Sequence, residues 1–162
     1  MLYPKPLPLI GTHKNNETFY FSPALHDLDS LPKKNWVCLC IANGEFDRAF
    51  FDDLMFYSFS SGLLNFTGEG KYGELLHDLF DETMVMYELD GNLELDIATF
   101  WGNEEPDSLA NELWNCFYVR ILPDHVNEAE ITVVCISLDG KDYQQQLAGY
   151  LQRFNEGWFP GE

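Results

Sequence analysis

The sequence predicts an α/β fold: a mostly parallel sheet with helices on both faces, carrying an antiparallel β-hairpin as an insertion or at an edge. Two long apolar runs, Trp36–Ala42 and Ile131–Leu138, have the composition of strands covered on both faces. Helical patterns alternate with strand patterns along the chain, which is typical of parallel sheets. The chain of 162 residues is one domain's worth, so we expect a single domain over residues 1–162.

The elements of the first half follow in order. Residues 1–35 are rich in prolines and turn residues, so we expect an irregular segment packed on the domain, with one short strand at Thr18–Phe21. Trp36–Ala42 is then the first central strand. Glu45–Ser60 repeats aromatic and apolar side chains at helical spacing, which predicts a helix, and Leu63–Thr67 predicts a second buried strand.

A β-hairpin is predicted at Met84–Phe100. Two runs of alternating apolar and polar residues flank a turn sequence at residues 90–92. A three-residue loop gathers the apolar side chains on one face, which we expect to be buried. That face comprises Val85, Tyr87, Leu89, Leu93, Leu95 and Ile97. The same register places Glu88 opposite Glu94, with Asp96 on the same polar face.

The remaining patterns predict three helices and one strand. Glu74–Asp81 is a short helix ahead of the hairpin, and another helix begins at Pro106, whose missing N–H suits the first helical position. Ile131–Leu138 is the third buried strand. A last helix, capped by Asp139, carries an apolar stripe that ends at Phe154.

The charge balance narrows the possible functions. Asp and Glu number 27 against 9 Lys and Arg, which gives a formal charge of −18. Direct binding to nucleic acid or to an anionic membrane surface needs a basic patch, so we expect neither. No apolar run reaches the roughly 18 residues of a membrane-spanning helix, and prolines interrupt the stretch where a secretion signal would lie. We therefore expect a cytoplasmic protein.

The four cysteines are expected to be buried as free thiols. Cys38, Cys40 and Cys135 lie in apolar strand patterns, and Cys116 lies in a helical pattern. Free cysteine is among the most buried residue types. The cysteines do not form the paired motifs of a metal site, and we expect neither a metal nor another cofactor.

One motif favours a different class of function. Gly68, Gly70 and Gly73 match the GxGxxG spacing of dinucleotide-binding loops, between a predicted strand and a predicted helix. The carboxylates of Glu69 and Glu74 would lie beside a bound pyrophosphate, which disfavours an anionic ligand. We interpret the motif as a glycine-rich turn and keep a nucleotide-dependent enzyme as an alternative.

Metal-binding and nucleophile motifs occur only as fragments. The dipeptide His77-Asp78 is part of a phosphohydrolase motif, and Glu74 with His77 has half of the spacing found in di-iron helices. The sequence has no nucleophile elbow and no cysteine in a basic setting. It therefore favours a binding protein over an enzyme, and a metal-dependent enzyme stays open as an alternative.

Charge segregation is the most pronounced feature of the chain. Residues 72–119 contain twelve acidic residues and no Lys or Arg. The twelve are Glu74, Asp78, Asp81, Glu82, Glu88, Asp90, Glu94, Asp96, Glu104, Glu105, Asp107 and Glu112. Three explanations are open: a general solubility charge, a basic protein partner, or cation binding without a calcium-loop motif. Like charges opposed across the predicted hairpin would destabilise it, which favours a partner that needs them.

In size, acidity and lack of a catalytic motif, the whole chain resembles the immunity proteins that neutralise bacterial toxins, many of which are basic nucleases. The resemblance implies a bacterial protein that binds a basic toxin domain. Its acidic face would cover the toxin's phosphate-binding site, and complementary charge would speed the encounter. An inhibitor that mimics DNA and occupies a DNA-binding protein is a further alternative.

We predict one partner-binding surface, formed by the hairpin and the residues that follow it. Acidic residues supply its charge, and two aromatic side chains supply anchors of the kind that dominate interface energies. The residues of this surface are Glu88, Glu94, Asp96, Phe100, Trp101, Glu104, Glu105 and Asp107.

Overall fold

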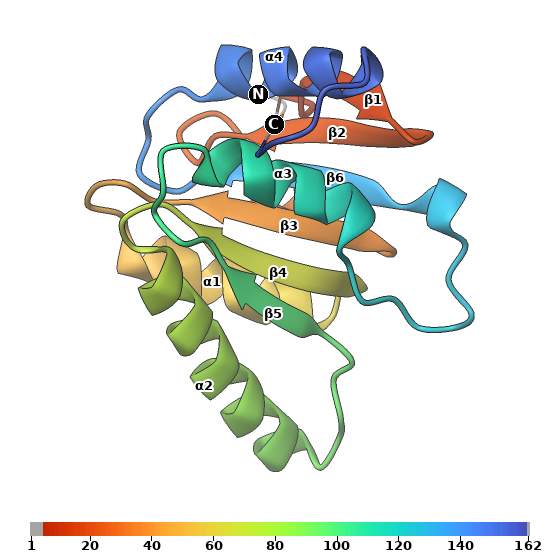
Figure 1. The fold of residues 1–162 in the computed structure, drawn as a ribbon. Helices are drawn as coiled ribbons and strands as arrows, with labels where there is room; N and C mark the ends of the chain where they lie inside the picture. The colour runs from red at the N-terminus through yellow and green to blue at the C-terminus, as the bar shows by residue number, and fades with distance from the viewer. Residues whose placement is uncertain (1–4, 162) are drawn as a thin grey trace.

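The fold was derived from a computed structural model that describes residues 5–161 (Figure 1). Within that range the strands are β1 (Leu9–His13), β2 (Asn16–Phe21), β3 (Trp36–Ile41), β4 (Leu63–Glu69), β5 (Ala98–Trp101) and β6 (Thr132–Ser137). The α-helices are α1 (Arg48–Phe59), α2 (Gly73–Gly91), α3 (Ser108–Tyr118) and α4 (Gln144–Asn155). Two short 3-10 turns lie at Leu28–Ser30 and Glu128–Glu130.

The described strands form one sheet in the order β1-β2-β6-β3-β4-β5. The pair β1–β2 is antiparallel, and every other neighbouring pair is parallel. The predicted α/β fold, with a mostly parallel sheet and an antiparallel hairpin at an edge, is confirmed. The three strands expected to be buried are β3, β4 and β6; they are neighbours at the centre of the sheet and are buried almost throughout.

The hairpin is formed by a different segment from the one predicted. Met84–Phe100 does not form it: α2 continues to Gly91, and β5 pairs in parallel with β4. The helical stripe that begins at Leu76 and Phe80 continues through Tyr87, which packs on the same core. That continuation outweighs the local alternation of apolar and polar residues.

Asn92 ends α2 instead of turning a hairpin. Its φ of 48° is left-handed, and its N–H donates to the Leu89 carbonyl at 3.3 Å. The N–H of Leu93 donates to the Glu88 carbonyl at 3.1 Å, which completes a Schellman cap. The Glu88 carboxylate accepts the N–H of Leu95 at 2.8 Å, so Glu88 is not opposed to Glu94 across two strands.

The face of this segment that was expected to be buried is partly in solvent. The exposed fractions of the Val85, Leu89 and Leu93 side chains are 50%, 72% and 42%. Tyr87, Leu95 and Ile97 pack against the core, as a helix with a return loop allows.

The antiparallel hairpin comes from the N-terminal segment, which is more regular than expected. Strands β1 and β2 are joined by Lys14 and Asn15, whose φ angles are 52° and 65°. Two consecutive residues with positive φ are typical of the tight turns that join twisted strands. The expected strand at Thr18–Phe21 is the second part of β2.

Successive side chains of each central strand point to opposite faces of the sheet and build two cores. Helices α1 and α2 cover one face, and α3 and α4 cover the other (Figure 1). In β3, Trp36, Cys38 and Cys40 belong to the first core, whereas Leu39 and Ile41 belong to the second. All four cysteines are buried free thiols, as the sequence predicts. Across residues 5–161, no helix has the length and hydropathy needed to cross a membrane.

The connections after β3 and β6 leave the sheet in opposite directions. These two strands are neighbours, yet β3 leads to α1 on one face and β6 leads to α4 on the other (Figure 1). In open α/β sheets, the crevice outside the carboxyl ends of two such strands is the usual place for a ligand. The topology therefore predicts a ligand site at the carboxyl ends of β3 and β6.

Candidate functional site

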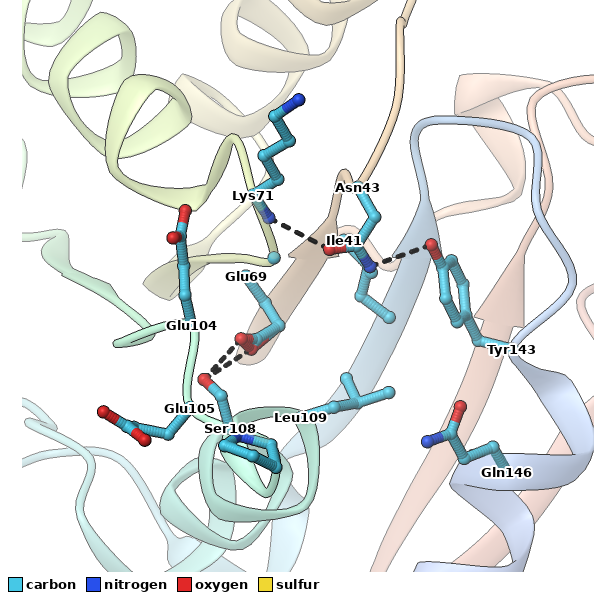
Figure 2. A pocket seen from close by; sticks show the side chains of 12 residues that line it. Ile41, Asn43, Glu69, Lys71, Glu104, Glu105, Ser108, Leu109, Tyr143 and Gln146 are labelled. Atoms are coloured by element: carbon cyan, nitrogen blue, oxygen red, sulfur yellow. Dashed lines mark hydrogen bonds between the residues drawn. The ribbon is translucent and has the colours of Figure 1, made fainter.

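A cavity of about 380 Å³ opens at the carboxyl ends of β3 and β4, where the fold leads us to expect a site. The loops after β3, β4 and β5 and the first turns of α3 and α4 surround it (Figure 2). Ile41 and Leu109 supply apolar surface, and Gln146 and Tyr143 stand on the α4 side. Polar and apolar groups thus converge in one crevice.

Glu69 is the most unusual residue of the cavity. It is the last residue of β4, and only 2% of its surface is exposed. The Ser108 hydroxyl, on the first residue of α3, donates to its Oε1 at 2.6 Å and lies 3.0 Å from its Oε2. Gly102 packs against the carboxylate so closely that a Cβ there would lie 2.5 Å from Oε1.

Burial raises the pKa of Glu69, and the nearby Glu104 carboxylate raises it further, against the lowering effect of the Ser108 bond. A second carboxyl group, that of Glu112, lies one turn further along α3 and is 8% exposed. Burial also raises the pKa of Glu112, and the neighbouring Glu69 adds to the shift. Two carboxyl groups are therefore held where ionisation is unfavourable.

Asn43 ties together the loops that follow β3, β4 and β6. Its side-chain amide donates to the Tyr143 hydroxyl at 3.0 Å, and its carbonyl oxygen accepts the backbone N–H of Lys71 at 3.0 Å (Figure 2). Its backbone N–H donates to the Asp139 carboxylate at 2.7 Å. These bonds fix one wall of the crevice.

Asp139 anchors this network from the loop after β6. The Tyr143 hydroxyl donates to its Oδ2 at 2.7 Å, and the backbone N–H of Lys141 donates to its Oδ1 at 3.0 Å. Partial burial alone would raise the pKa of Asp139, but the hydrogen bonds from Tyr143, Asn43 and Lys141 together lower it below its ordinary value. Asp139 is thus ionised at neutral pH.

Close packing accounts for Gly68 and Gly70 of the GxGxxG match. A Cβ on Gly68 would lie 2.2 Å from the carbonyl oxygen of Gly73, so this strand and helix could not approach as they do. Gly70 has a φ of +95°, and a Cβ there would lie 2.5 Å from Oδ1 of Asn43. The motif does lie between a strand and a helix, but the loop presents Glu69 to the cavity.

Among the described residues that line the cavity, Lys71 is the basic one. Its side chain points away from Glu69 (Figure 2), and its ammonium lies 5.4 Å from the centre of the Tyr72 ring. The acidic side chains of the lining are those of Glu69, Glu104 and Glu105. The crevice is therefore negatively charged.

The structure separates the predicted partner-binding residues into two groups. Glu104 and Glu105 line the cavity, and Asp107 lies in the same loop; all three are exposed. Phe100 is partly buried at the end of β5, and the next residue, Trp101, is 48% exposed with its ring 4.4 Å from that of His77. This group meets at the carboxyl end of the sheet.

The second group lies at the other end of β5. Glu94 and Asp96 are exposed in the loop that leads into β5, and Glu88 is in the last turns of α2. The predicted opposition of Glu88 and Glu94 does not form, because Glu88 accepts the N–H of Leu95. The edge strand β5 thus has acidic residues at both ends.

Besides Glu104 and Glu105, the crevice is built by residues that sequence reasoning did not assign to a site: Asn43, Glu69, Ser108, Asp139 and Tyr143. Asp139 was expected to cap the last helix, but the N-cap of α4 is Tyr143. One pattern could have indicated Glu69, since a carboxylate at the end of a strand that is predicted to be buried is unusual. The others come from separate loops, and only the strand order brings them together.

Within the part of the chain that the structure describes, neither of the motif fragments around His77 is completed into a metal site. Its Nδ1 lies 2.9 Å from the Asp78 carboxylate, and its Nε2 lies 3.3 Å from that of Asp81. Over residues 5–161, no three His, Cys, Asp or Glu side chains are grouped as metal ligands.

Comparisons with protein-family models, curated proteins and solved structures gave no match to this chain.

Proposed function

We propose that this chain binds a basic protein and that its crevice receives a lysine or arginine side chain of that partner. One observation carries the proposal: the crevice presents the carboxylates of Glu69, Glu104 and Glu105, while the ammonium of Lys71 points away. A cationic group is the ligand that such walls favour, because desolvated opposite charges attract strongly.

The shape of the crevice supports a long cationic side chain. The methylene stem of a lysine or arginine can lie on the apolar surface of Ile41 and Leu109. Its charged head would face the exposed carboxylates of Glu104 and Glu105, while the buried Glu69 carboxylate adds negative charge to the same wall. A phosphate group in the same place would meet carboxylates.

Other acidic residues near this edge have structural roles and carry less weight. Asp47 caps α1 by accepting the N–H groups of Ala49 and Phe50, and acids at helix N-termini are favourable in any protein. The carboxylates of Glu104 and Glu105 have no hydrogen-bond or ion-pair partner within residues 5–161. The fold gives no reason for these two charges, and a basic partner would.

Neutralisation of a basic toxin is the form of this function that we favour, because a strongly acidic inhibitor is steered towards such a target. The net charge of −18 gives steering over the whole surface, and the crevice gives one point of contact.

The charge preference of the crevice can be tested by NMR titration of the chain with arginine amide, ATP and NAD. We expect arginine amide to produce saturable shifts of the Asn43, Gly70 and Ser108 amides, and ATP and NAD to produce none. The variant Glu104→Gln/Glu105→Gln should weaken the response, whereas the matched control Glu17→Gln/Glu130→Gln, altered at exposed sites near the other end of the strands, should not. Saturable binding of ATP or NAD would favour a nucleotide-dependent enzyme instead.

A further inference from the structure

The C-terminal half of α2 presents large apolar side chains to solvent. Val85, Met86 and Leu89 have exposed fractions of 50%, 59% and 72%, and Leu93, just after the helix, has 42%. These four side chains are called the α2 ridge below. Tyr87, on the opposite side of the helix, packs against the core, so the ridge faces solvent.

The fold does not account for these apolar side chains. A helix of the 19 residues of α2 is about 28 Å long, whereas a strand of the seven residues of β4 spans about 23 Å. Figure 1 shows the end of α2 extending past the sheet. Contiguous exposed apolar patches on proteins usually mark interaction sites.

A hollow of about 730 Å³ lies along the ridge, lined by Val85, Leu89 and Leu93 together with polar neighbours. Of these neighbours, Glu88 and Glu94 are acidic. The helix and the loop that leads from it to β5 carry no Lys or Arg, since residues 72–119 contain none. The patch therefore combines an apolar centre with a negatively charged surround.

This combination distinguishes between possible occupants. A second copy of the chain would bring one acidic rim against another, and an anionic membrane surface would be repelled in the same way. A basic amphipathic helix satisfies both parts of the patch. Its apolar stripe would cover the ridge, and its lysines and arginines would face the acidic rim.

We infer that the α2 ridge is a docking site for a basic amphipathic helix. The inference rests on the proposed function and deepens it, because it identifies the structural element through which the basic partner makes its apolar contact. The crevice lies at the other end of α2, so the two contacts are separable by mutation.

The test uses a fluorescent synthetic peptide of about 18 residues, with leucines at the i, i+3, i+4 and i+7 positions of a helix and lysines elsewhere. A peptide with the same composition in scrambled order is the control for charge alone. Fluorescence anisotropy near physiological salt, about 0.15 M, gives the Kd of each. We expect the amphipathic peptide to bind at least about tenfold more tightly than the scrambled one.

Two double variants locate the binding. Val85→Gln/Leu89→Gln removes apolar surface from the ridge, and we expect it to raise the Kd of the amphipathic peptide about tenfold. Leu25→Gln/Ile121→Gln is the matched control, because these side chains are exposed by 54% and 63% and lie outside the ridge. It should leave the affinity unchanged. Circular dichroism checks that both variants keep the fold.

Several results would overturn the inference. Equal affinity for the two peptides, or full affinity in the ridge variant, would mean that the ridge is not the docking site. Sedimentation showing a wild-type dimer and a monomeric ridge variant would assign the ridge to a second copy. The proposed function would survive each of these if arginine amide still titrates the crevice, and it would fail separately if arginine amide does not.

Discussion

At the scale of single residues, the buried carboxyl group of Glu69 is the group that the fold would be more stable without. Ser108 supplies one hydroxyl donor, and burial outweighs that bond and raises the pKa of Glu69. An ionised carboxylate in such surroundings costs stability. Carboxyl groups in clefts whose pKa is shifted by burial and a neighbouring charge are candidates for functional sites.

Replacing Glu69 by glutamine should therefore stabilise the protein in a pH-dependent way. Because the folded pKa is raised, the folded state binds the proton more tightly than the unfolded state, and wild-type stability falls as pH rises through the folded pKa. We expect Glu69→Gln to melt at a higher temperature than wild type near pH 7, with a smaller difference near pH 4. Calorimetry at both pH values checks this. A difference that does not change with pH would contradict it.

Asp139 should affect the pH dependence of stability in the opposite direction. Its folded pKa is lowered, so its contribution to stability is present above the ordinary aspartate pKa and is lost as pH falls through the folded value. In Asp139→Asn, one of the two carboxylate oxygens that accept hydrogen bonds from Asn43, Lys141 and Tyr143 is replaced by an amide group. We expect a loss of about 1 kcal/mol at neutral pH, modest because the carboxyl group is partly exposed. Urea denaturation at pH 7 and pH 3 measures it, and an undiminished loss at pH 3 would be inconsistent with this role.

At the scale of elements, α2 is where local sequence and fold disagree most. The alternation in residues 84–89 has the period of a strand, and residues 90–92 have the composition of a turn. The helical stripe through Leu76, Phe80 and Tyr87 is longer and reaches a core that a hairpin would not reach. Asn92 suits both structures, because a tight turn and a helix cap each require a residue with positive φ.

A substitution at Val85 distinguishes the two structures. On the exposed face of a helix, alanine is favoured over valine, so Val85→Ala should raise stability by a few tenths of a kcal/mol, about 0.5 at most. In a buried strand the same change would cost about 1 kcal/mol or more. Urea denaturation gives the difference in unfolding free energy, and a clear loss would argue for the hairpin.

Strands β3 and β6 could be predicted from sequence because they are largely apolar on both faces and need no knowledge of their neighbours. Strand β4 was predicted from its shorter apolar run, although it also buries Asn65, Thr67 and Glu69. The crevice could not be predicted in that way. Asn43 and Asp139 are far apart in sequence and ordinary in composition, and they meet because β3 lies next to β6. Glu104 and Glu105 were predicted from charge alone, and their place at the cavity follows from the β5–α3 connection.

At the scale of the whole molecule, the net charge of −18 affects both the stability of the fold and the rate of association with partners. Self-repulsion among the carboxylates destabilises the compact state and is screened by salt. We expect the melting temperature to rise as sodium chloride increases from about 0.02 M to about 0.5 M. Differential scanning calorimetry measures this, and a melting temperature that falls over the series would contradict it.

The central claim is that the acidic surface around the crevice captures a basic protein. The most direct measurement is the rate at which this chain associates with the proteins encoded by the genes flanking its own, over a salt series. We expect a basic protein among them to associate at a rate that falls steeply with salt, and Glu104→Gln/Glu105→Gln, but not Glu17→Gln/Glu130→Gln, to slow it and flatten the salt dependence. Absence of association with any of them, or a wild-type rate for Glu104→Gln/Glu105→Gln at every salt concentration, would contradict the claim.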